Sequence, residues 1–395
     1  MKESKRRILM INILIFGSGR VGLLTGAMLA SSGDYHVHIA DIQADKKSLT
    51  LGKHAHNLTH CVLDIMKEDN VKAYIKEHNI TALAAALPYF LTKKVAEMAK
   101  ACDTNYFDLT EDVETTKYVE TLSQNSDKVF APQCGLAPGF ISVVTNDLVK
   151  LFDEAETVKM RVGALPVNIS HPLQYALTWS TEGLINEYVK PCEAIEDFKN
   201  VTIDPLDDLE TIKIDGLTYE AFNTSGGIGS LKDTYKGKVR NINYKSVRYP
   251  GHCEKLRFLI NDLKLKDKQV LLCEIFNNAI PRVEDDVVLV YVSVEGTING
   301  VYSERHFAKK YHSQEAFGQQ WSALQLTTAC GLCVTIDLAL KQAHFKAGFA
   351  KQEDITLAQM MDNRFGHYYR YNFLDNCADN PKSELGTNPS KREYI

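Results

Sequence analysis

The sequence predicts an α/β fold in which a doubly wound parallel sheet comes first and an α+β domain follows. Strand-like and helix-like segments alternate over the first ~135 residues, which is typical of a parallel sheet covered by helices on both faces. A glycine-rich turn joins the first strand-like segment to the first helix-like one. From about residue 156 the alternation gives way to longer strand-like runs, which favours a second domain of a different class.

The apolar run 8–16 predicts the first strand, and 23–30 predicts the helix that follows it. The turn between them has the spacing G-x-G-x-x-G. In this context the first glycine permits a sharp turn, the second lets the backbone approach a pyrophosphate, and the third lets helix and strand pack closely. Free N–H groups at a helix N-terminus bind phosphates. We therefore predict a dinucleotide-binding turn formed by Gly17, Ser18, Gly19, Arg20, Val21 and Gly22.

An acidic residue follows the second predicted strand, 35–39. Asp41 stands 24 positions after Gly17. A carboxylate at this point accepts hydrogen bonds from the adenosine ribose and repels a 2′-phosphate, so it favours NAD over NADP. Lys46 and Lys47 follow closely and would tolerate a phosphate, so NADP remains possible.

The alternation continues to about residue 132. A short apolar segment covers 61–65, further strands are predicted at 80–86, 105–109 and 128–132, and helices at 68–78, 91–101 and 113–122. Ligands of such sheets bind beyond the carboxyl ends of the strands. We therefore expect five loops to form the mouth of one site, namely 17–22, Asp41, 87–89, 108–111 and 134–139.

The later part of the chain predicts strands at 158–164 and 286–295, a long apolar helix at 315–341 and a polar tail from 363, its end loosely ordered. The length of 395 residues is long for one domain. We expect a dinucleotide-binding domain at 1–140, an α+β substrate and dimerisation domain at 141–310, and a returning helix with a tail at 311–395.

Composition narrows the class of protein. The composition, with 45% hydrophobic and 24% charged residues, is ordinary for a soluble globular chain. The net charge of −5 gives no reason to expect nucleic acid or anionic membrane as a partner. The basic start and the run 8–16 imitate a signal peptide, but no A-x-A-like cleavage site follows. No run approaches the ~20 apolar residues of a membrane span. The odd number of cysteines, nine, shows no disulfide framework, so we expect a cytoplasmic protein.

Three groups of reactive residue types have competing interpretations. His54, His56 and His60 suggest a metal, but only Cys61 stands near them, so a loop role is favoured. The C-x-x-C pair Cys330 and Cys333 lies in the apolar helix and is better explained as buried small residues. In the loop after the strand 105–109, Asp112 is expected to cap the next helix.

Cys134 and Arg248 are candidates for chemistry. Cys134 lies at a strand end in the predicted mouth, where it is either a weak acid beside the nicotinamide or a small residue filling space. Arg248 is our candidate for binding a substrate carboxylate through two parallel hydrogen bonds. The alternative is that it forms a surface salt bridge. We expect Tyr89 and Cys134 to be the polar groups beside the reacting carbon.

A family resemblance is carried by seven stretches in order along the chain. They are 15–22, Ala-Leu-Pro-Tyr at 86–89, 107–112, 134–139, 219–227, 247–252 and 324–338. Through them the chain resembles the saccharopine dehydrogenase family, and in particular bacterial saccharopine dehydrogenase and lysine 6-dehydrogenase members.

This resemblance implies a Rossmann domain, an inserted α+β domain that holds the substrate, a late helix returning to the first domain, and, by analogy, a homodimer. It also implies that Leu87 and Pro88 line the nicotinamide ribose and that Ala137 and Pro138 lie along the cofactor. The residues that would face an amino-acid substrate are Tyr89, Trp179, Ser180, Thr181, Asn223, Thr224 and Arg248.

Two positions depart from the glutamate-forming saccharopine enzymes of fungi and animals. Those enzymes have Asp where this chain has Ala137, and Arg where it has Thr224. Loss of a substrate-facing Arg removes a bidentate partner for one carboxylate. This weakens the case for saccharopine, which has three carboxylates, and strengthens that for a smaller diamino acid such as lysine.

These observations predict an NAD-dependent oxidoreductase acting on a C–N bond of a lysine-related amino acid. A base or a water first accepts a proton from nitrogen, hydride then passes to the nicotinamide, and water hydrolyses the imine. Saccharopine oxidoreduction is one hypothesis. Lysine 6-dehydrogenation or a related polyamine-forming reduction is the second, and a non-catalytic dinucleotide-binding scaffold is the third.

Overall fold

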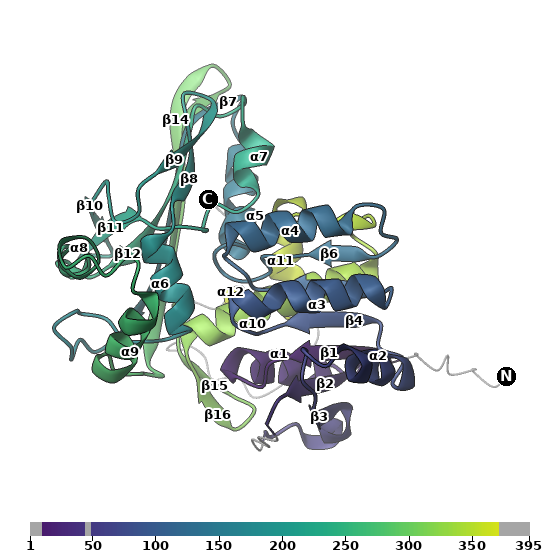
Figure 1. Cartoon of the computed structure of the whole chain (residues 1–395). Coiled ribbons are helices and arrows are strands. Elements are labelled where there is room, and N and C mark those ends of the chain that lie inside the picture. Colours follow the sequence, from purple (N-terminus) through teal and green to yellow (C-terminus); the bar gives the residue numbers. More distant parts are fainter. Residues whose placement is uncertain (1–9, 44–48, 371–395) are drawn as a thin grey trace, which may run out of the picture.

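Two β-sheets dominate the computed structural model, which describes residues 10–43 and 49–370 (Figure 1). The first sheet is parallel, with the order β17-β6-β5-β4-β1-β2-β3. The chain leaves the central strand β1 in both directions, so the predicted doubly wound sheet is confirmed. Its strands are β1 (Ile11–Phe16), β2 (Tyr35–Asp41), β3 (Leu58–Val62), β4 (Ala82–Ala85), β5 (Asn105–Asp108), β6 (Val129–Ala131) and β17 (Gly348–Phe349).

Helices cover both faces of this sheet, so its central strands are apolar throughout. All four residues of β4 are buried, for example, because a strand covered on both faces has no solvent side. The predicted helices agree with the observed ones to within a few residues. They are α1 (Arg20–Ser31), α2 (Glu68–Glu77), α3 (Tyr89–Ala101) and α4 (Val113–Ser123). A 3₁₀ turn that the sequence did not predict, η1 (Gly52–Asn57), precedes β3. The Asp112 carboxylate accepts a hydrogen bond from the Thr115 N–H at 2.8 Å, so its predicted capping role is confirmed.

The second sheet is mixed, with the order β10-β11-β12-β7-β13-β14. Within this order β12 runs parallel to β7 and the other neighbours are antiparallel. The strands are β7 (Glu154–Pro166), β8 (Cys192–Glu196), β9 (Lys199–Ile203), β10 (Glu210–Ile214), β11 (Leu217–Asn223), β12 (Asn241–Arg248), β13 (Asp286–Ile298) and β14 (Val301–His312). The accompanying helical segments are α5 (Phe140–Val149), α6 (Thr181–Val189), α7 (Leu231–Tyr235), α8 (His252–Arg257), the π-helical turn η2 (Phe258–Asp262) and α9 (Gln269–Ala279).

The second sheet curls, because its two ends approach each other. Lys310 of β14 pairs at 3.0 Å with Asp215, which lies between β10 and β11 at the opposite end of the strand order. Under the β10–β11 hairpin lies a small apolar core that includes Leu165, Val247 and Leu289.

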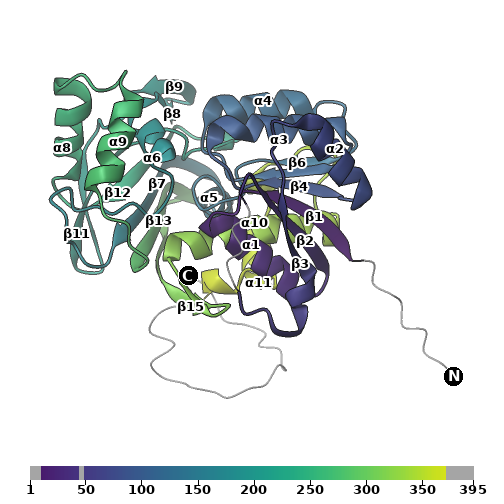
Figure 2. The same ribbon diagram turned by 60° about the horizontal axis from the view of Figure 1, so that its bottom comes forward.

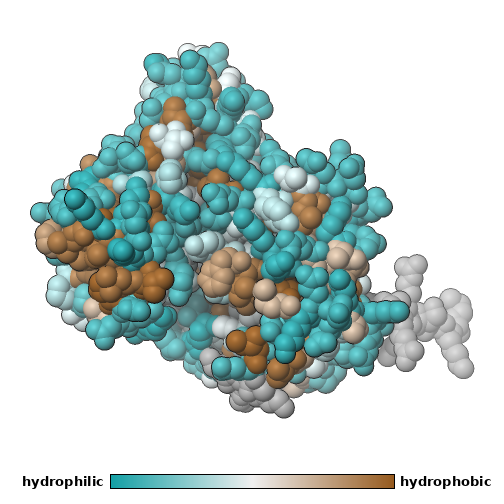
Figure 3. Space-filling model, in the orientation of Figure 1, coloured by the Kyte–Doolittle hydropathy of each residue, from teal (hydrophilic) through white to brown (hydrophobic). Residues whose placement is uncertain are grey.

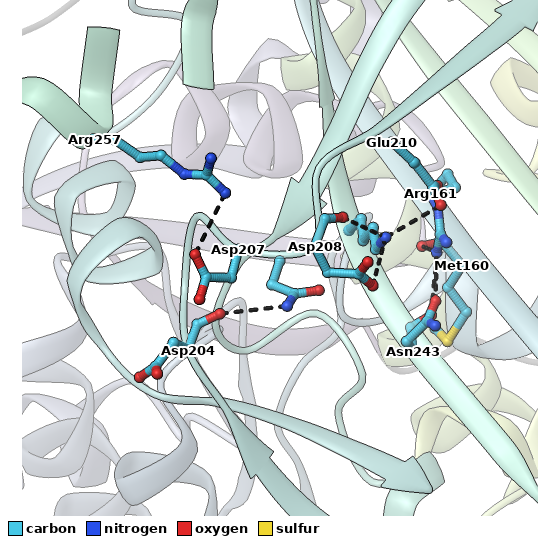
Figure 4. Close-up of polar contacts among 10 residues, drawn as sticks. Met160, Arg161, Asp204, Asp207, Asp208, Glu210, Asn243 and Arg257 are labelled. Atoms are coloured by element: carbon cyan, nitrogen blue, oxygen red, sulfur yellow. Dashed lines mark hydrogen bonds and ion pairs between the residues drawn. The ribbon is translucent and has the colours of Figure 1, made fainter. Parts of the chain in front are cut away.

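A buried cluster of ion pairs links this hairpin to β7 and β12 (Figure 4). Arg161 and Lys245 are opposite each other on β7 and β12, and each side chain is only 2% exposed. Two buried positive charges are costly to the folded state unless carboxylates pair with them. Glu210 pairs with both, at 3.1 Å from Lys245, and Asp208 pairs with Lys245 at 2.8 Å.

We predict that Glu210→Gln lowers the free energy of unfolding by about 2 kcal/mol, because it leaves two buried cations undercompensated while Glu210 itself is partly exposed. Urea denaturation measures the change. The matched control is Glu295→Gln, which removes the more exposed Lys159–Glu295 pair and should cost under about 1 kcal/mol. Equal effects of the two substitutions would contradict the argument.

The long helix begins later than the sequence predicts. Residues 315–321 belong instead to a hairpin of β15 (Gln314–Ala316) and β16 (Gln319–Trp321). Phe317 and Gly318 between these strands both have positive φ, which the two-residue turn of a hairpin requires. Helix α10 (Ala323–Gln342) then starts at the capping box of Ser322 and Gln325.

By length and composition alone, helix α10 could cross a membrane. This corrects our expectation that no run in the sequence approaches the length of a membrane span. However, 78% of its apolar window is buried within the structure. It packs against α1 and β13, between the two sheets (Figure 2), as a core helix does. Cys330 and Cys333 are fully buried in it, as predicted. All eight cysteines among the described residues are free thiols.

The segment after α10 returns to the first sheet. Strand β17 pairs with β6, and Tyr369 stacks on Phe140 of α5 with 3.9 Å between ring centroids. The remaining elements are η3 (Gln352–Asp354), α11 (Leu357–Asp362) and α12 (His367–Arg370). The predicted loosely ordered end of the tail, and Lys46 and Lys47, lie outside the described residues.

Apolar side chains are exposed on the second domain over α8, η2 and α9 (Figure 3). That the protein forms a homodimer, as the family resemblance implies, stays a prediction. The exposed residues of this region are Phe258, Leu263, Val270 and Leu271.

Candidate active site

The glycine turn has the geometry that its spacing predicts. Gly17 has φ of +109°, and a Cβ there would stand 2.3 Å from the carbonyl oxygen of Ala86. A Cβ on Gly22 would stand 2.1 Å from the Gly17 oxygen, so the helix and the turn pack as closely as glycine allows. At Gly19 nothing lies within 4 Å of the Cβ position. That side of the turn is therefore open to a ligand.

The carboxylate of Asp41 is held against this turn. It accepts hydrogen bonds from the Ser18 N–H at 2.8 Å and the Ser18 hydroxyl at 2.7 Å. The Ile42 N–H donates to its other oxygen at 2.7 Å. Burial opposes ionisation, but these hydrogen bonds outweigh it and lower the pKa of Asp41 below its usual value. Asp41 is thus a fixed anion at the end of β2, where a ribose would reach it.

A cavity of about 660 Å³ lies beyond the glycine turn, between the two sheets. This volume is in the range of small-molecule sites. The first domain contributes the turn and the loops after β4, β5 and β6, and the second contributes β7, β12, α6 and the loop before it. The residues predicted from sequence that line it are Gly19, Arg20, Val21, Gly22, Leu87, Pro88, Tyr89, Ala137, Pro138, Trp179, Ser180 and Arg248.

The residues present fit a dinucleotide. The N-terminus of α1 has no side-chain cap, so its first N–H groups are available to phosphate oxygens. Gly19 leaves room for a pyrophosphate, and Asp41 is held at the end of β2, where the sequence predicts that the adenosine ribose binds. Leu87, in the loop after β4, and Pro138, in the loop after β6, line the same cavity.

Cys134 does not line the cavity, contrary to its predicted place beside the reacting carbon. Its thiol is fully buried and donates to the Ala131 carbonyl at 3.0 Å, while the Gln352 amide approaches its sulfur at 3.4 Å. Burial raises the pKa of Cys134 far above its usual value, so the thiol stays neutral. The alternative interpretation, a small residue filling space, is the one that the structure supports.

Three other predicted substrate residues lie behind the cavity wall rather than in it. The Thr181 hydroxyl donates to the Asn277 side chain at 2.7 Å. Asn223 donates to the Asp204 carbonyl at 3.3 Å, and Thr224 bonds at 2.8 Å to Ser246, which does line the cavity. The Thr224 hydroxyl is therefore held by Ser246 rather than facing the cavity, which corrects its predicted place beside the substrate.

Tyr89, the first residue of α3, lines the cavity. Burial raises its pKa, and the carboxylates of Asp112 and Glu111 add to the effect. The phenol is therefore protonated at neutral pH and acts as a hydrogen-bond donor, not as a base.

Arg248 lies at the end of β12 and is buried, not at a surface salt bridge. Its Nε donates to the Tyr188 hydroxyl at 3.0 Å and Nη1 to the Val247 carbonyl at 2.9 Å. The guanidinium carbon also stands 4.9 Å from the ring centroid of Tyr175. A guanidinium has five N–H donors, so these contacts fix Arg248 and leave donors for a ligand carboxylate.

A chain of hydrogen bonds orients this arginine. His252 Nδ1 lies 2.8 Å from the Leu173 carbonyl, so Nδ1 carries the proton and Nε2 accepts one. Tyr188 lies 3.1 Å from that Nε2, donates to it, and accepts from Arg248. Burial and the positive charge of Arg248 lower the pKa of His252 to about 3, consistent with a neutral ring.

Two carboxyls that sequence reasoning did not assign face the same cavity. Glu187 lies on α6, one turn after Gly183, and is 8% exposed. Burial raises the pKa of Glu187 to about 8, against the opposing charge of Arg248. Its position in an ordinary helical segment carries no motif, so sequence alone offered no signal for it.

Glu111 comes from the first domain, in the loop after β5. One carboxylate oxygen stands 3.0 Å from the Cβ position of Gly183, so the glycine makes room for it. Burial raises the pKa of Glu111 to about 7, and the carboxylates of Asp112 and Asp108 contribute. The sequence placed this loop at the mouth but did not single out this residue.

Arg20 fastens the glycine turn to the second domain. Its guanidinium pairs with Glu284 at 3.1 Å, donates to Gln319 at 3.1 Å, and lies 4.3 Å from the ring centroid of Trp321. The β15–β16 hairpin and the glycine turn are thereby joined at the rim of the cavity.

Two family models together span most of the chain. Residues 13–135 match the saccharopine dehydrogenase NADP binding domain, and residues 135–363 match the saccharopine dehydrogenase C-terminal domain. Among solved structures, the chain is similar to apo saccharopine dehydrogenase (L-Glu forming) from Saccharomyces cerevisiae, with a TM-score of 0.67 and 15% identity over 87% of this chain and 94% of that one. It is also similar to a homospermidine synthase from Legionella pneumophila in complex with NAD, with a TM-score of 0.62 and 13% identity over 91% and 89% of the two chains. At these identities the likeness is one of fold.

Proposed function

The chain belongs to the saccharopine dehydrogenase family, and from this premise we propose that it is an NAD-dependent oxidoreductase acting on the C–N bond of a lysine-related amino acid. One observation supports this most strongly. Arg248, Glu187 and Glu111 meet in one cavity that opens onto the dinucleotide turn. A non-catalytic scaffold has no need for ionisable groups that converge on one cavity with shifted pKa values, so we disfavour that alternative.

Each cavity residue has a role in this proposal. Arg248 binds a substrate carboxylate through its free donors. Tyr89 donates a hydrogen bond near the reacting centre. Glu111, whose pKa lies near neutrality, accepts the proton that the substrate nitrogen must lose before hydride leaves the adjacent carbon. The bound nicotinamide supplies the hydride acceptor, and the protein supplies orientation and charge.

The first test is a turnover assay. Purified protein with NAD or NADP is followed at the absorbance of the reduced nicotinamide, first with saccharopine and then with lysine. Turnover of lysine but not saccharopine assigns the lysine 6-dehydrogenase type, and the reverse assigns the saccharopine type. Tight NAD binding with no turnover of either amino acid would favour one of the two alternatives, a polyamine-forming reduction or a non-catalytic dinucleotide-binding scaffold.

We predict that Asp41→Ala shifts cofactor preference toward NADP by about tenfold or more. The substitution removes both a ribose acceptor and a charge that repels the 2′-phosphate. The ratio of kcat/KM for NAD and NADP measures the shift. Ser18→Ala, which removes one of the hydrogen bonds that orient Asp41, should shift the ratio in the same direction by less. An unchanged ratio in Asp41→Ala contradicts the ribose assignment.

A further inference from the structure

Arg20 places a positive charge at the positive end of a helix. It is the first residue of α1, and the first turn of this helix contains no acidic residue. The N-terminus of a helix has a partial positive charge, so a cation there is unfavourable unless an anion lies close by. The position of Arg20 therefore indicates that an anion accompanies it at the glycine turn.

In the structure this anion comes from the second domain. Glu284, in the loop between α9 and β13, pairs with Arg20 Nη2 at 3.1 Å. Among the described residues it is the carboxylate that neutralises Arg20, because the other groups on the guanidinium are neutral. They are the side-chain oxygens of Gln319 and Gln325, at 3.1 and 3.3 Å from guanidinium nitrogens, the Gln320 carbonyl and the Trp321 ring.

Glu284 is also the partner of Arg20 that an incoming anion can replace most easily. Its side chain is 59% exposed, and an ion pair with so exposed a carboxylate contributes little to stability. A guanidinium has five N–H donors and binds phosphate as well as carboxylate oxygens. A phosphate oxygen can therefore replace Glu284 while the neutral contacts keep Arg20 in place.

The ion pair lies at the place where such an oxygen is expected. Arg20 and Glu284 both line the cavity, and Gly19 lines it beside them. Nothing lies within 4 Å of the Cβ position of Gly19, the side of the turn that is open to a pyrophosphate. A carboxylate that stayed at this rim would repel the phosphates and occupy a donor that they could use.

We propose that Glu284 is an internal competitor of the dinucleotide. Before binding, its carboxylate occupies the Arg20 guanidinium, and on binding a pyrophosphate oxygen takes its place. Glu284 thereby lowers the affinity for the dinucleotide, and its release removes one link between the glycine turn and the second domain. This inference concerns the dinucleotide alone and does not depend on which substrate the second domain binds.

The test measures the dissociation constant of ADP-ribose by calorimetry. ADP-ribose has the pyrophosphate but lacks the nicotinamide, so no turnover takes place. Glu284→Gln should tighten its binding by about three- to tenfold, because the substitution removes both the competing ion pair and a like charge near the phosphates.

The matched control is Asp285→Asn. Asp285 is the next residue and is also exposed, but its carboxylate accepts a hydrogen bond from the Ser313 hydroxyl at 2.9 Å. This variant loses the same charge without touching Arg20. Because an exposed charge is screened by salt, it should change the dissociation constant by less than about twofold.

A second pair of variants tests whether Glu284 acts through Arg20. Arg20→Gln should weaken ADP-ribose binding by about tenfold, the value of a charge-assisted contact with phosphate. Adding Glu284→Gln to Arg20→Gln should then change the constant by less than about twofold, since the competition needs both partners.

Three results overturn the inference. Unchanged or weaker binding by Glu284→Gln would make the ion pair a structural link only. Tightening no larger than that of Asp285→Asn would make it a general effect of charge. Tightening that persists in the Arg20→Gln background would place Glu284 against the ligand itself. Because Glu284 is exposed, its variant should fold as the wild type does, which circular dichroism checks. Failure of the proposed function appears instead as absence of nicotinamide reduction, which these binding constants do not require.

Discussion

We expect Arg248→Lys to lower kcat/KM for the amino-acid substrate by roughly 100-fold and to leave KM for NAD within about twofold. Lysine keeps the positive charge but lacks the planar fork that binds a carboxylate through two hydrogen bonds. It also cannot donate to Tyr188 and the Val247 carbonyl while still facing the cavity, contacts that fix the arginine at 3.0 and 2.9 Å. Steady-state kinetics with each substrate varied in turn measures both constants.

The matched control for this substitution is Arg257→Lys. Arg257 belongs to α8 in the same domain, donates to the Leu206 carbonyl at 2.8 Å and pairs with the exposed Asp207 at 3.4 Å (Figure 4). It does not line the cavity, so its replacement should leave both KM values unchanged. If Arg248→Lys affects KM for NAD as much as that for the amino acid, the carboxylate role is wrong.

We expect Glu111→Gln to lower kcat for oxidation by about 100- to 1,000-fold, which is within the usual contribution of a general base. A base works only when deprotonated. Burial raises the pKa of Glu111 to about 7, so the wild-type rate should increase as pH rises through about 7 and then level off. The variant should lose this limb of the pH profile. A pH series of kcat/KM from 5.5 to 9 for both proteins is the measurement.

Glu114→Gln is the control for Glu111→Gln, because Glu114 is an exposed residue in the first turn of α4. Glu187 also titrates in the cavity, as burial raises its pKa to about 8. The Glu187→Gln protein should therefore keep the limb near pH 7. If Glu111→Gln keeps it as well, the proton acceptor is not Glu111.

Much of the first domain could be predicted because its signals are local. The spacing of Gly17, Gly19 and Gly22 reflects contacts within one strand–turn–helix unit, where a Cβ would collide with backbone a few residues away. The place of Asp41 could be predicted for the same reason, since it ends the next strand. The boundary of α10 was predicted less well, because apolar composition does not reveal that Phe317 and Gly318 turn the chain back.

The errors in the site have a different cause. Cys134 stands at a strand end, as predicted, but its side chain points into the core, where Gln352 from a distant segment approaches the sulfur. Thr181 and Thr224 have the expected positions along the chain, yet their hydroxyls are used by Asn277 and Ser246. Position in sequence determines the loop, but not the direction of the side chain.

The sequence by itself determined the family, the glycine turn and the place of Asp41 at the end of the second strand, because each depends on residue types at short, fixed spacing. The ribose role of Asp41 stays a prediction. Only the tertiary structure showed that Glu111, Glu187 and Arg248 share one cavity. These residues come from a loop of the first sheet, a helix and a strand of the second, and no spacing rule connects them. Folding brings these ionisable side chains together in one cavity, and this depends on the packing of the two domains rather than on any local pattern.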